Sequence, residues 1–389
     1  MKSNTSRRDF LSAGLILPVV GAGSSLGLLN LSAQTPAGNA ASAGSAASPL
    51  KLSYKTLGKT GLKVTSVGMG CMITSDPSVV TRAADLGITY FDTARGYQHG
   101  NNERMVGAAL GSKRKQVVLS TKTEARDKAG ALAQLDTSLS ELKTDYVDIW
   151  YLHGMSRPDD IHDDMIEAQQ LAKQQGKARF VGISTHSGQA QLIPWMVQKG
   201  VFDVVLSKFN FSSDTDLEQA IDAAAKAGMG VVAMKVMAGG ARSNQKLTQP
   251  GALLAALKWV TNHPSVATTV PSMTDMAQLD ENLKAMAEPI TADDHKVLAA
   301  HLEQIKPLYC RMCGHCDGAC QKGLPVADVL RILTYADGYR QFALARERFQ
   351  ELSSTHRAVR CGDCAECTVQ CPHGVHVSER IARAQELFA

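Results

Sequence analysis

The sequence predicts an α/β protein: a closed barrel of eight parallel strands, a (β/α)8 barrel, followed by a small, mainly helical domain. Two observations predict this fold. Over residues 50–306, short apolar runs alternate with longer segments whose apolar residues recur at three- and four-residue spacing. Eight of the nine cysteines in the 389-residue chain lie beyond that region, so residues 307–389 form a separate predicted domain.

The first 33 residues form a predicted targeting segment and are excluded from the fold. The arginine pair Arg7-Arg8 precedes an apolar stretch that small residues close by Ala33. This arrangement resembles the bacterial twin-arginine (Tat) signal, which implies the Tat export machinery as a partner and a periplasmic location. A transmembrane anchor is the alternative, although glycines and serines dilute the stretch. Residues 34–49, rich in Ala, Gly and Ser, predict a flexible linker.

Eight apolar runs are candidate strands. They cover residues 66–70, 90–92, 117–121, 147–152, 179–183, 204–206, 231–234 and 267–270. The clearest helical patterns between them cover residues 79–86, 103–110, 131–139, 165–174, 217–225 and 253–261. An open doubly wound sheet is the alternative, but no Gly-x-Gly-x-x-Gly follows the first strand. The repeat therefore favours the closed barrel.

Four polar residues follow the ends of neighbouring candidate strands. Asp92 ends the second strand, Tyr97 lies in the loop after it, Lys122 follows the third and His153 follows the fourth. Singly, each has an ordinary explanation, as a helix cap, a loop anchor, a surface lysine or a rim histidine. Because the carboxyl ends of barrel strands meet at one mouth, we expect the four side chains to form one site.

These residues lie in motifs that resemble the aldo-keto reductase family. The matching stretches are Phe91-Asp92-Thr93-Ala94-Arg95-Gly96-Tyr97, Thr121-Lys122, Tyr146-Val147-Asp148-Ile149-Trp150-Tyr151-Leu152-His153 and Val181-Gly182-Ile183-Ser184. The resemblance implies an oxidoreductase that interconverts small carbonyl compounds and alcohols. It also implies that Tyr97 is the proton donor, that Lys122 and Asp92 tune it, and that His153 orients the substrate oxygen.

The same roles follow from acid-base chemistry. A hydride that arrives at a carbonyl carbon leaves charge on the oxygen, so a proton must be delivered there. We expect the Lys122 ammonium to lower the pKa of Tyr97 toward the working range, with Asp92 keeping the lysine charged. A neutral His153 donates a hydrogen bond to the carbonyl oxygen.

The resemblance further implies a nicotinamide cofactor, NAD(P)(H), across the mouth of the barrel. The residues at the matching positions are Ser184, Phe209, Lys235, Gly239, Gly240, Ser272, Gln278, Glu281 and Asn282. The family's cations for the 2'-phosphate of NADP are replaced by Ser272 and Gln278, and Asp275 adds a negative charge. The sequence therefore favours NAD(H), although Lys235 offers a cation from another loop.

The C-terminal cysteines form two runs with the spacing Cys-x2-Cys-x2-Cys-x3-Cys, the bacterial ferredoxin signature for 4Fe-4S clusters. By the two-cluster ferredoxin rule, the fourth cysteine of each run ligates the other cluster. The expected ligand sets are Cys310, Cys313, Cys316 and Cys371 for one cluster, and Cys361, Cys364, Cys367 and Cys320 for the other. A zinc ribbon and periplasmic disulfides are the alternatives. Apolar spacing over residues 325–352 predicts two helices, which resembles the helical ferredoxin modules of respiratory enzymes.

Composition limits the function classes. Hydrophobic residues make up 44% and charged residues 20%, and the net charge is only +4, without a clustered basic face that would bind nucleic acid. The leading hypothesis is an exported oxidoreductase whose two 4Fe-4S clusters transfer electrons to or from a redox protein partner. The alternatives are an electron-transfer protein with an inactive barrel, and a reductase whose clusters are purely structural.

Overall fold

The computed structural model describes residues 51–240 and 249–388. These residues belong to one compact unit, Pro49–Ala389. The predicted targeting segment, residues 1–33, and the predicted linker, residues 34–49, lie outside the described residues. In the part of the chain that the structure describes, no helix is long and apolar enough to cross a membrane.

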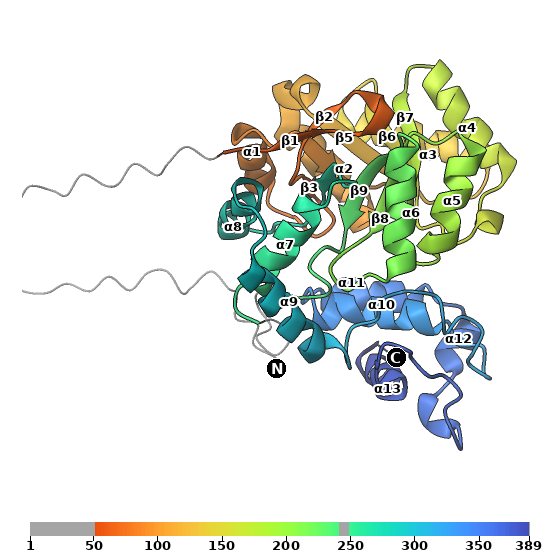
Figure 1. Cartoon of the computed structure of the whole chain (residues 1–389). Coiled ribbons are helices and arrows are strands. Elements are labelled where there is room, and N and C mark those ends of the chain that lie inside the picture. The colour runs from red at the N-terminus through yellow and green to blue at the C-terminus, as the bar shows by residue number, and fades with distance from the viewer. Residues whose placement is uncertain (1–50, 241–248, 389) are drawn as a thin grey trace, which may run out of the picture. The chain divides into compact units, whose positions relative to one another are not determined.

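Eight parallel strands form the barrel, in the order in which they occur along the chain. They are β3 (Met69–Gly70), β4 (Tyr90–Asp92), β5 (Val118–Thr123), β6 (Val147–Leu152), β7 (Ala178–Thr185), β8 (Val204–Lys208), β9 (Gly230–Met234) and β10 (Thr268–Thr269). Parallel bridges from Val67 to Thr269 and from Gly70 to Ser272 join the first strand to the last. The predicted (β/α)8 barrel is therefore confirmed (Figure 1).

Helices follow the strands and cover the outside of the barrel (Figure 1). They are α1 (Pro77–Asp85), α2 (Asn101–Leu110), α3 (Lys128–Leu142), α4 (Asp163–Gln174), α5 (Gln189–Lys199), α6 (Thr215–Lys226), α7 (Ala252–Asn262), α8 (Met276–Ala287) and α9 (Ala292–Ile305). Short 3-10 turns lie at η1 (Gly58–Thr60), η2 (Tyr97–Gly100), η3 (Gly111–Gln116) and η4 (Pro158–Asp160). The buried residues of the α-helices recur at helical spacing, as the sequence pattern predicts.

An antiparallel hairpin that the sequence did not indicate closes the floor of the barrel. Its strands, β1 (Tyr54–Thr56) and β2 (Lys63–Thr65), flank Leu57, which is fully buried with side chains that fill the barrel interior. A Cβ added at Gly58 would lie 2.5 Å from the backbone of Gly228 and Gly230, at the start of β9. The hairpin therefore packs at the amino ends of the strands, opposite the mouth.

The first and last predicted strands are longer than the observed ones. The segment predicted at residues 66–70 pairs regularly only over Met69–Gly70, and the one predicted at 267–270 only over Thr268–Thr269. Helices α5, α8 and α9 were also not predicted. Pro194 inside α5 obscures its helical pattern.

The C-terminal region packs around its own apolar core. Its helices are α10 (Val326–Asp337), α11 (Phe342–Gln350), α12 (Ser354–Ala358) and α13 (Val377–Phe388), with a 3-10 turn η6 (Cys361–Asp363). Helices α10 and α11 are the two helices that the sequence predicts between residues 325 and 352. The rings of Phe349 in α11 and Phe388 in α13 contact each other in this core, with centroids 5.7 Å apart and planes tilted by 48°.

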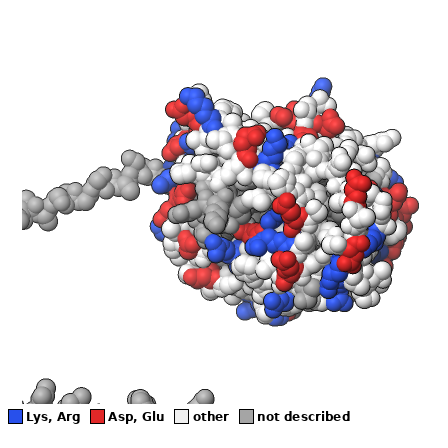
Figure 2. Space-filling view, turned by 90° about the horizontal axis from the view of Figure 1, so that it is seen from below, with Lys and Arg blue, Asp and Glu red and all other residues white. Residues whose placement is uncertain are grey.

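The C-terminal region joins the barrel along a tight seam. Arg311 Nη1 lies 3.0 Å from Asp214 Oδ1, and Asn210 Nδ2 donates to the Tyr309 hydroxyl at 3.3 Å. A Cβ added at Gly338 would lie 2.5 Å from the carbonyl oxygen of Gly239, so the two backbones touch. On the face seen in Figure 2, basic and acidic side chains are interspersed.

Candidate active site

The structure brings the four predicted catalytic side chains together at the carboxyl end of the barrel. The Lys122 ammonium, at the end of β5, donates to Asp92 Oδ2 at 2.6 Å, to the Thr93 carbonyl at 2.7 Å and to the Tyr97 hydroxyl at 3.2 Å. These three bonds use all its N–H groups. The Tyr97 and His153 rings meet edge to face, with centroids 5.8 Å apart.

A constrained turn positions Tyr97. Gln98 and His99, which follow it, have left-handed backbone angles, with φ of 50° and 52°. Residues other than glycine adopt this conformation at an energetic cost, so other contacts must hold the turn. The Gln98 side chain supplies two of them, donating to the carbonyls of Met72 and Thr74 at 3.2 and 2.9 Å.

The electrostatics of the site keep Tyr97 protonated. Burial, reinforced by the nearby Asp92 carboxylate, raises the pKa of Tyr97 well above its ordinary value. The prediction that Lys122 lowers this pKa is wrong, because burial dominates and Asp92, 2.6 Å from the ammonium, offsets the charge of the lysine. Burial also lowers the pKa of Lys122 and of His153, so the imidazole is neutral, as expected.

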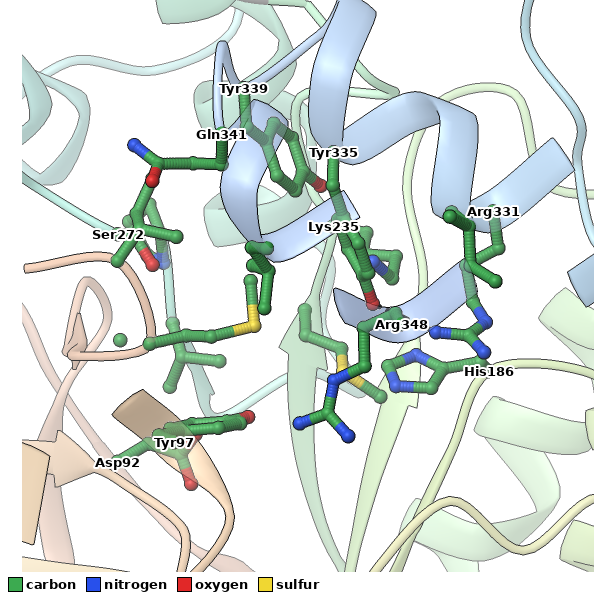
Figure 3. Close-up of a pocket in the computed structure, with 18 of the residues that line it drawn as sticks. Asp92, Tyr97, His186, Lys235, Ser272, Arg331, Tyr335, Tyr339, Gln341 and Arg348 are labelled. Carbon is green, nitrogen blue, oxygen red and sulfur yellow. Dashed lines mark hydrogen bonds between the residues drawn. The ribbon is translucent and has the colours of Figure 1, made fainter. Parts of the chain in front are cut away.

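The site opens into a cavity of about 1280 Å³ that both regions of the chain line. The barrel supplies Asp92, Tyr97 and His153, and helices α10 and α11 form the roof. Figure 3 shows roof side chains, among them Tyr335 and Arg348, projecting toward the space above Tyr97. A cavity of this size holds more than a small carbonyl compound.

Only part of the predicted cofactor set lines this cavity. Lys235, Gly240, Ser272 and Gln278 do so. The lining residues do not include Ser184, Phe209, Gly239, Glu281 and Asn282.

Three of the residues outside the lining have packing or hydrogen-bonding roles instead. The Ser184 hydroxyl accepts from the Gly154 amide at 3.0 Å. Phe209 packs against Trp259 and His263, with ring centroids 5.2 and 5.1 Å away. A Cβ on Gly239 would lie 2.8 Å from the Tyr309 ring, so close packing between the barrel and the C-terminal region accounts for a glycine at this position.

The lining includes side chains that the sequence did not single out. They are Glu124, His186, Arg331, Tyr335 and Arg348. Glu124 lies two residues beyond Lys122, so its position after a strand was a usable signal. The helical residues gave none, because spacing shows which face of a helix is apolar but not which surface it covers.

The C-terminal cysteines lie in two groups, and each group combines cysteines from both runs of the sequence. Cys310, Cys313, Cys316 and Cys371 line one small cavity. Burial, together with the nearby thiols of Cys316, Cys313 and Cys371, raises the pKa of Cys310 to about 12. Burial likewise raises the pKa of Cys361, with Cys367, Cys320 and Cys364 as its thiol neighbours. None of the eight forms a disulfide.

These sets fit 4Fe-4S clusters, because each groups four soft sulfur ligands that gain from a metal's positive charge. One cysteine of the first set, Cys313, also belongs to a second possible metal site. Ligand atoms of Asp214, Cys313 and His373 lie within 4.8 Å of one another. A single metal ion held there would take Cys313 away from its set.

The barrel and its Asp-Tyr-Lys-His mouth define an oxidoreductase of the (β/α)8 class. The model of the aldo/keto reductase family matches residues 75–253 and 251–303, and the chain belongs to this family. The match ends before the cysteine-rich region begins.

Individual relatives agree with this assignment. The chain is 27% identical over 296 residues to the uncharacterized oxidoreductase YqkF of Bacillus subtilis, covering 64% of this chain and 96% of that protein. It is 28% identical over 287 residues to L-galactose dehydrogenase of Arabidopsis thaliana, covering 61% and 89%. Among solved structures, aldo-keto reductase AKR11C1 from Bacillus halodurans superposes with a TM-score of 0.56 at 26% identity, covering 64% and 96%.

Proposed function

We propose that this chain is a Tat-exported aldo-keto reductase that exchanges electrons with a redox protein partner through two 4Fe-4S clusters. The observation that carries the proposal is the Tyr97 hydroxyl, 3.2 Å from the Lys122 ammonium, in a cavity whose roof belongs to the cysteine-rich region. The substrate is a small carbonyl compound or alcohol.

The residues of the chain handle the proton. In carbonyl reduction, hydride goes to the carbonyl carbon and the Tyr97 hydroxyl gives its proton to the oxygen. Lys122, within hydrogen-bond reach, stabilises the phenolate that remains. His153 is neutral and directs an N–H toward the substrate oxygen. When bound, a nicotinamide supplies or accepts the hydride.

The residues favour NAD(H) over NADP(H). Gln278 does not face a phosphate freely, because it donates to Thr274 Oγ1 at 2.8 Å and to Asp275 Oδ2 at 2.7 Å. Asp275 also caps α8 by accepting from the Gln278 amide. A 2'-phosphate beside this carboxylate would be repelled.

The cysteine sets supply the route for electrons in this proposal. When bound, 4Fe-4S clusters held by these cysteines would supply one-electron transfer between the barrel region and the partner. An exported enzyme meets no pool of free nicotinamide, so the chain must retain its nucleotide tightly or recharge it from a partner. The proposal includes export to the periplasm through the Tat machinery, directed by the Arg7-Arg8 pair of the leader.

The test is an assay of the anaerobically purified full chain with aldehydes as substrates. Electrons come from NADH, from NADPH or from reduced methyl viologen, and bound nucleotide is extracted and separated by chromatography. We expect turnover, and at least about tenfold tighter binding of NADH than of NADPH. Absence of turnover with all three donors would favour the electron-transfer protein with an inactive barrel.

A separate experiment addresses export. Replacing Arg7 and Arg8 by lysine should leave the chain in the cytoplasm, where fractionation followed by iron analysis detects it. Unchanged export of the double variant would contradict the Tat assignment.

A further inference from the structure

Cations gather at the end of the cavity formed by α10 and α11. Arg331 and Arg348 come from these helices, and Lys235 comes from the loop after β9. Figure 3 shows Arg331, Arg348 and His186 grouped along one wall of the cavity, across from Tyr97 and Asp92.

The protein only partly neutralises these cations. Arg331 contacts Asp328 at 3.1 Å, and Arg348 contacts Glu351 at 3.0 Å and Glu124 at 3.8 Å, but these acids are 55%, 51% and 39% exposed to solvent. Among the described residues, no carboxylate forms an ion pair with Lys235. Its ammonium lies instead over the rings of Tyr335 and Tyr339, 4.9 and 5.5 Å from their centroids.

The pKa of Tyr335 indicates that the electrostatic potential at this wall is positive. Its hydroxyl lies 2.9 Å from Arg331 Nη1. Burial alone opposes ionisation of this phenol, yet Lys235 and Arg331 outweigh it and lower the pKa of Tyr335 to about 8. The buried Nδ1 of His186, beside the same cations, has no hydrogen-bond partner among the described residues. The wall therefore attracts negative charge.

This wall lies close to the reacting atoms. Glu124 Oε1 is 3.3 Å from His153 Nδ1 and 3.8 Å from Arg348 Nη2, so one carboxylate links the imidazole to the roof. Ser272, where the family places its 2'-phosphate contact, lies on the other side of Lys235 from Arg331 (Figure 3). An anion at this wall would therefore sit near the substrate carbonyl rather than at the 2'-phosphate.

We propose that Lys235, Arg331 and Arg348 bind a carboxylate of the substrate, so that the substrate is a carbonyl compound or alcohol bearing a carboxylate. This inference rests on the proposed carbonyl chemistry at Tyr97. Arginine pairs bidentately with carboxylates, and three cations in one wall hold the anion in a fixed orientation. The C-terminal region thereby selects the substrate of the barrel.

The test compares aldehydes that differ by a carboxylate: 4-oxobutanoate with butanal, and glucuronate with glucose. We expect wild-type kcat/KM to be at least about tenfold higher for the acid of each pair. Arg348→Gln and Lys235→Gln should each reduce this preference about tenfold, chiefly through KM. Arg346→Gln, an exposed arginine on the same helix, is the matched control and should keep it.

Binding of succinate, followed by calorimetry, tests the wall without turnover. Wild type should bind it at least about tenfold more tightly than Arg348→Gln. Reduction of acids and neutral aldehydes at equal efficiency, or equal succinate binding by wild type and variant, would overturn the inference while leaving the proposed chemistry intact. Variants that lose about tenfold in NADH affinity but none in succinate affinity would assign the wall to the nucleotide pyrophosphate and overturn it too. Loss of all turnover in wild type with succinate binding retained would refute the proposed chemistry alone.

Discussion

The barrel rim consists of Asp92, Tyr97, Lys122 and His153. There the charge of Lys122 is neutralised within the protein by Asp92, 2.6 Å away, and both side chains are almost fully buried. At the roof, Lys235 lies over two phenol rings. Arg331 pairs with Asp328 and Arg348 with Glu351, and both acids are partly exposed to solvent. Rim and roof line the same cavity but differ in what they leave for a ligand. At the rim, the Lys122 ammonium has partners within the protein for all its N–H groups. At the roof, the cations are only partly paired and can bind an anionic ligand.

This difference assigns separate tasks to the two regions. A saturated hydrogen-bond network fixes the geometry of a reaction, because none of its members can rearrange cheaply. An incompletely paired group of cations instead gains its partner when a ligand arrives. We therefore infer that the rim carries the carbonyl chemistry and that the roof carries the specificity of this chain.

The largest expected effect comes from breaking the rim. Tyr97→Phe removes the proton donor and should reduce kcat for aldehyde reduction by about 100- to 10,000-fold, with iron content and succinate affinity retained. Steady-state kinetics and iron analysis measure both. Tyr146→Phe, a tyrosine that packs on Arg114 away from the cavity, is the control. Unchanged turnover in Tyr97→Phe would refute the role of the rim.

The next effect probes the roof through pH. Below pH 8 Tyr335 is a neutral phenol, and above pH 8 it becomes a phenolate that competes with a bound carboxylate for Lys235 and Arg331. The dissociation constant of succinate should therefore rise up to about tenfold per pH unit above pH 8. Tyr97, Tyr339 and Arg348 also lie near this phenol, and His186 lines the same cavity.

The variant Tyr335→Phe distinguishes titration of the Tyr335 hydroxyl from titration of the neighbouring groups. It lacks the titrating hydroxyl, so its succinate affinity should stay flat between pH 7 and pH 9. A wild-type profile equally flat over that range would show that Tyr335 does not compete with the anion.

A smaller effect concerns the cysteine sets behind the roof. Cys371→Ser removes one ligand of the first set and should lower the iron content of the anaerobic protein from about eight to about four atoms per chain. Cys71→Ser, in the barrel core, should leave it unchanged. Zinc in place of iron in the wild-type protein would instead favour a zinc site, such as the one that Asp214, Cys313 and His373 outline.

The smallest effect tests the seam. Gly338→Ala places a methyl group 2.5 Å from the Gly239 carbonyl and should lower the free energy of unfolding by about 1–3 kcal/mol. Gly362→Ala meets no atom within 4 Å and serves as the control in the same denaturation experiment. Equal midpoints for both variants would show that the seam adjusts freely.

The sequence was sufficient for the rim and insufficient for the roof, for a physical reason. Asp92, Lys122 and His153 follow strands, and parallel register alone brings strand ends together. Arg331 and Tyr335 lie four residues apart on a helix, which predicts that they are neighbours but not that they face Tyr97. That placement depends on how two packed regions meet, and local periodicity contains no information about it.

The same reason explains the errors in the barrel. The β1–β2 hairpin is held by Leu57 inside the barrel and by contacts with β9, more than 160 residues later in the chain. Phe209, which lies at a position that matches the family, packs with Trp259 and His263, which come from a later part of the chain. Such long-range contacts cannot be read from a window of residues.

The hairpin also has a practical consequence for handling the protein. The hairpin strand β1 begins at Tyr54, at the amino ends of the barrel strands. The cavity and the roof lie at the carboxyl ends. A tag placed just before β1 would therefore immobilise the molecule on a sensor or an electrode by its base, with the mouth and the cysteine-rich region left open to ligands in solution.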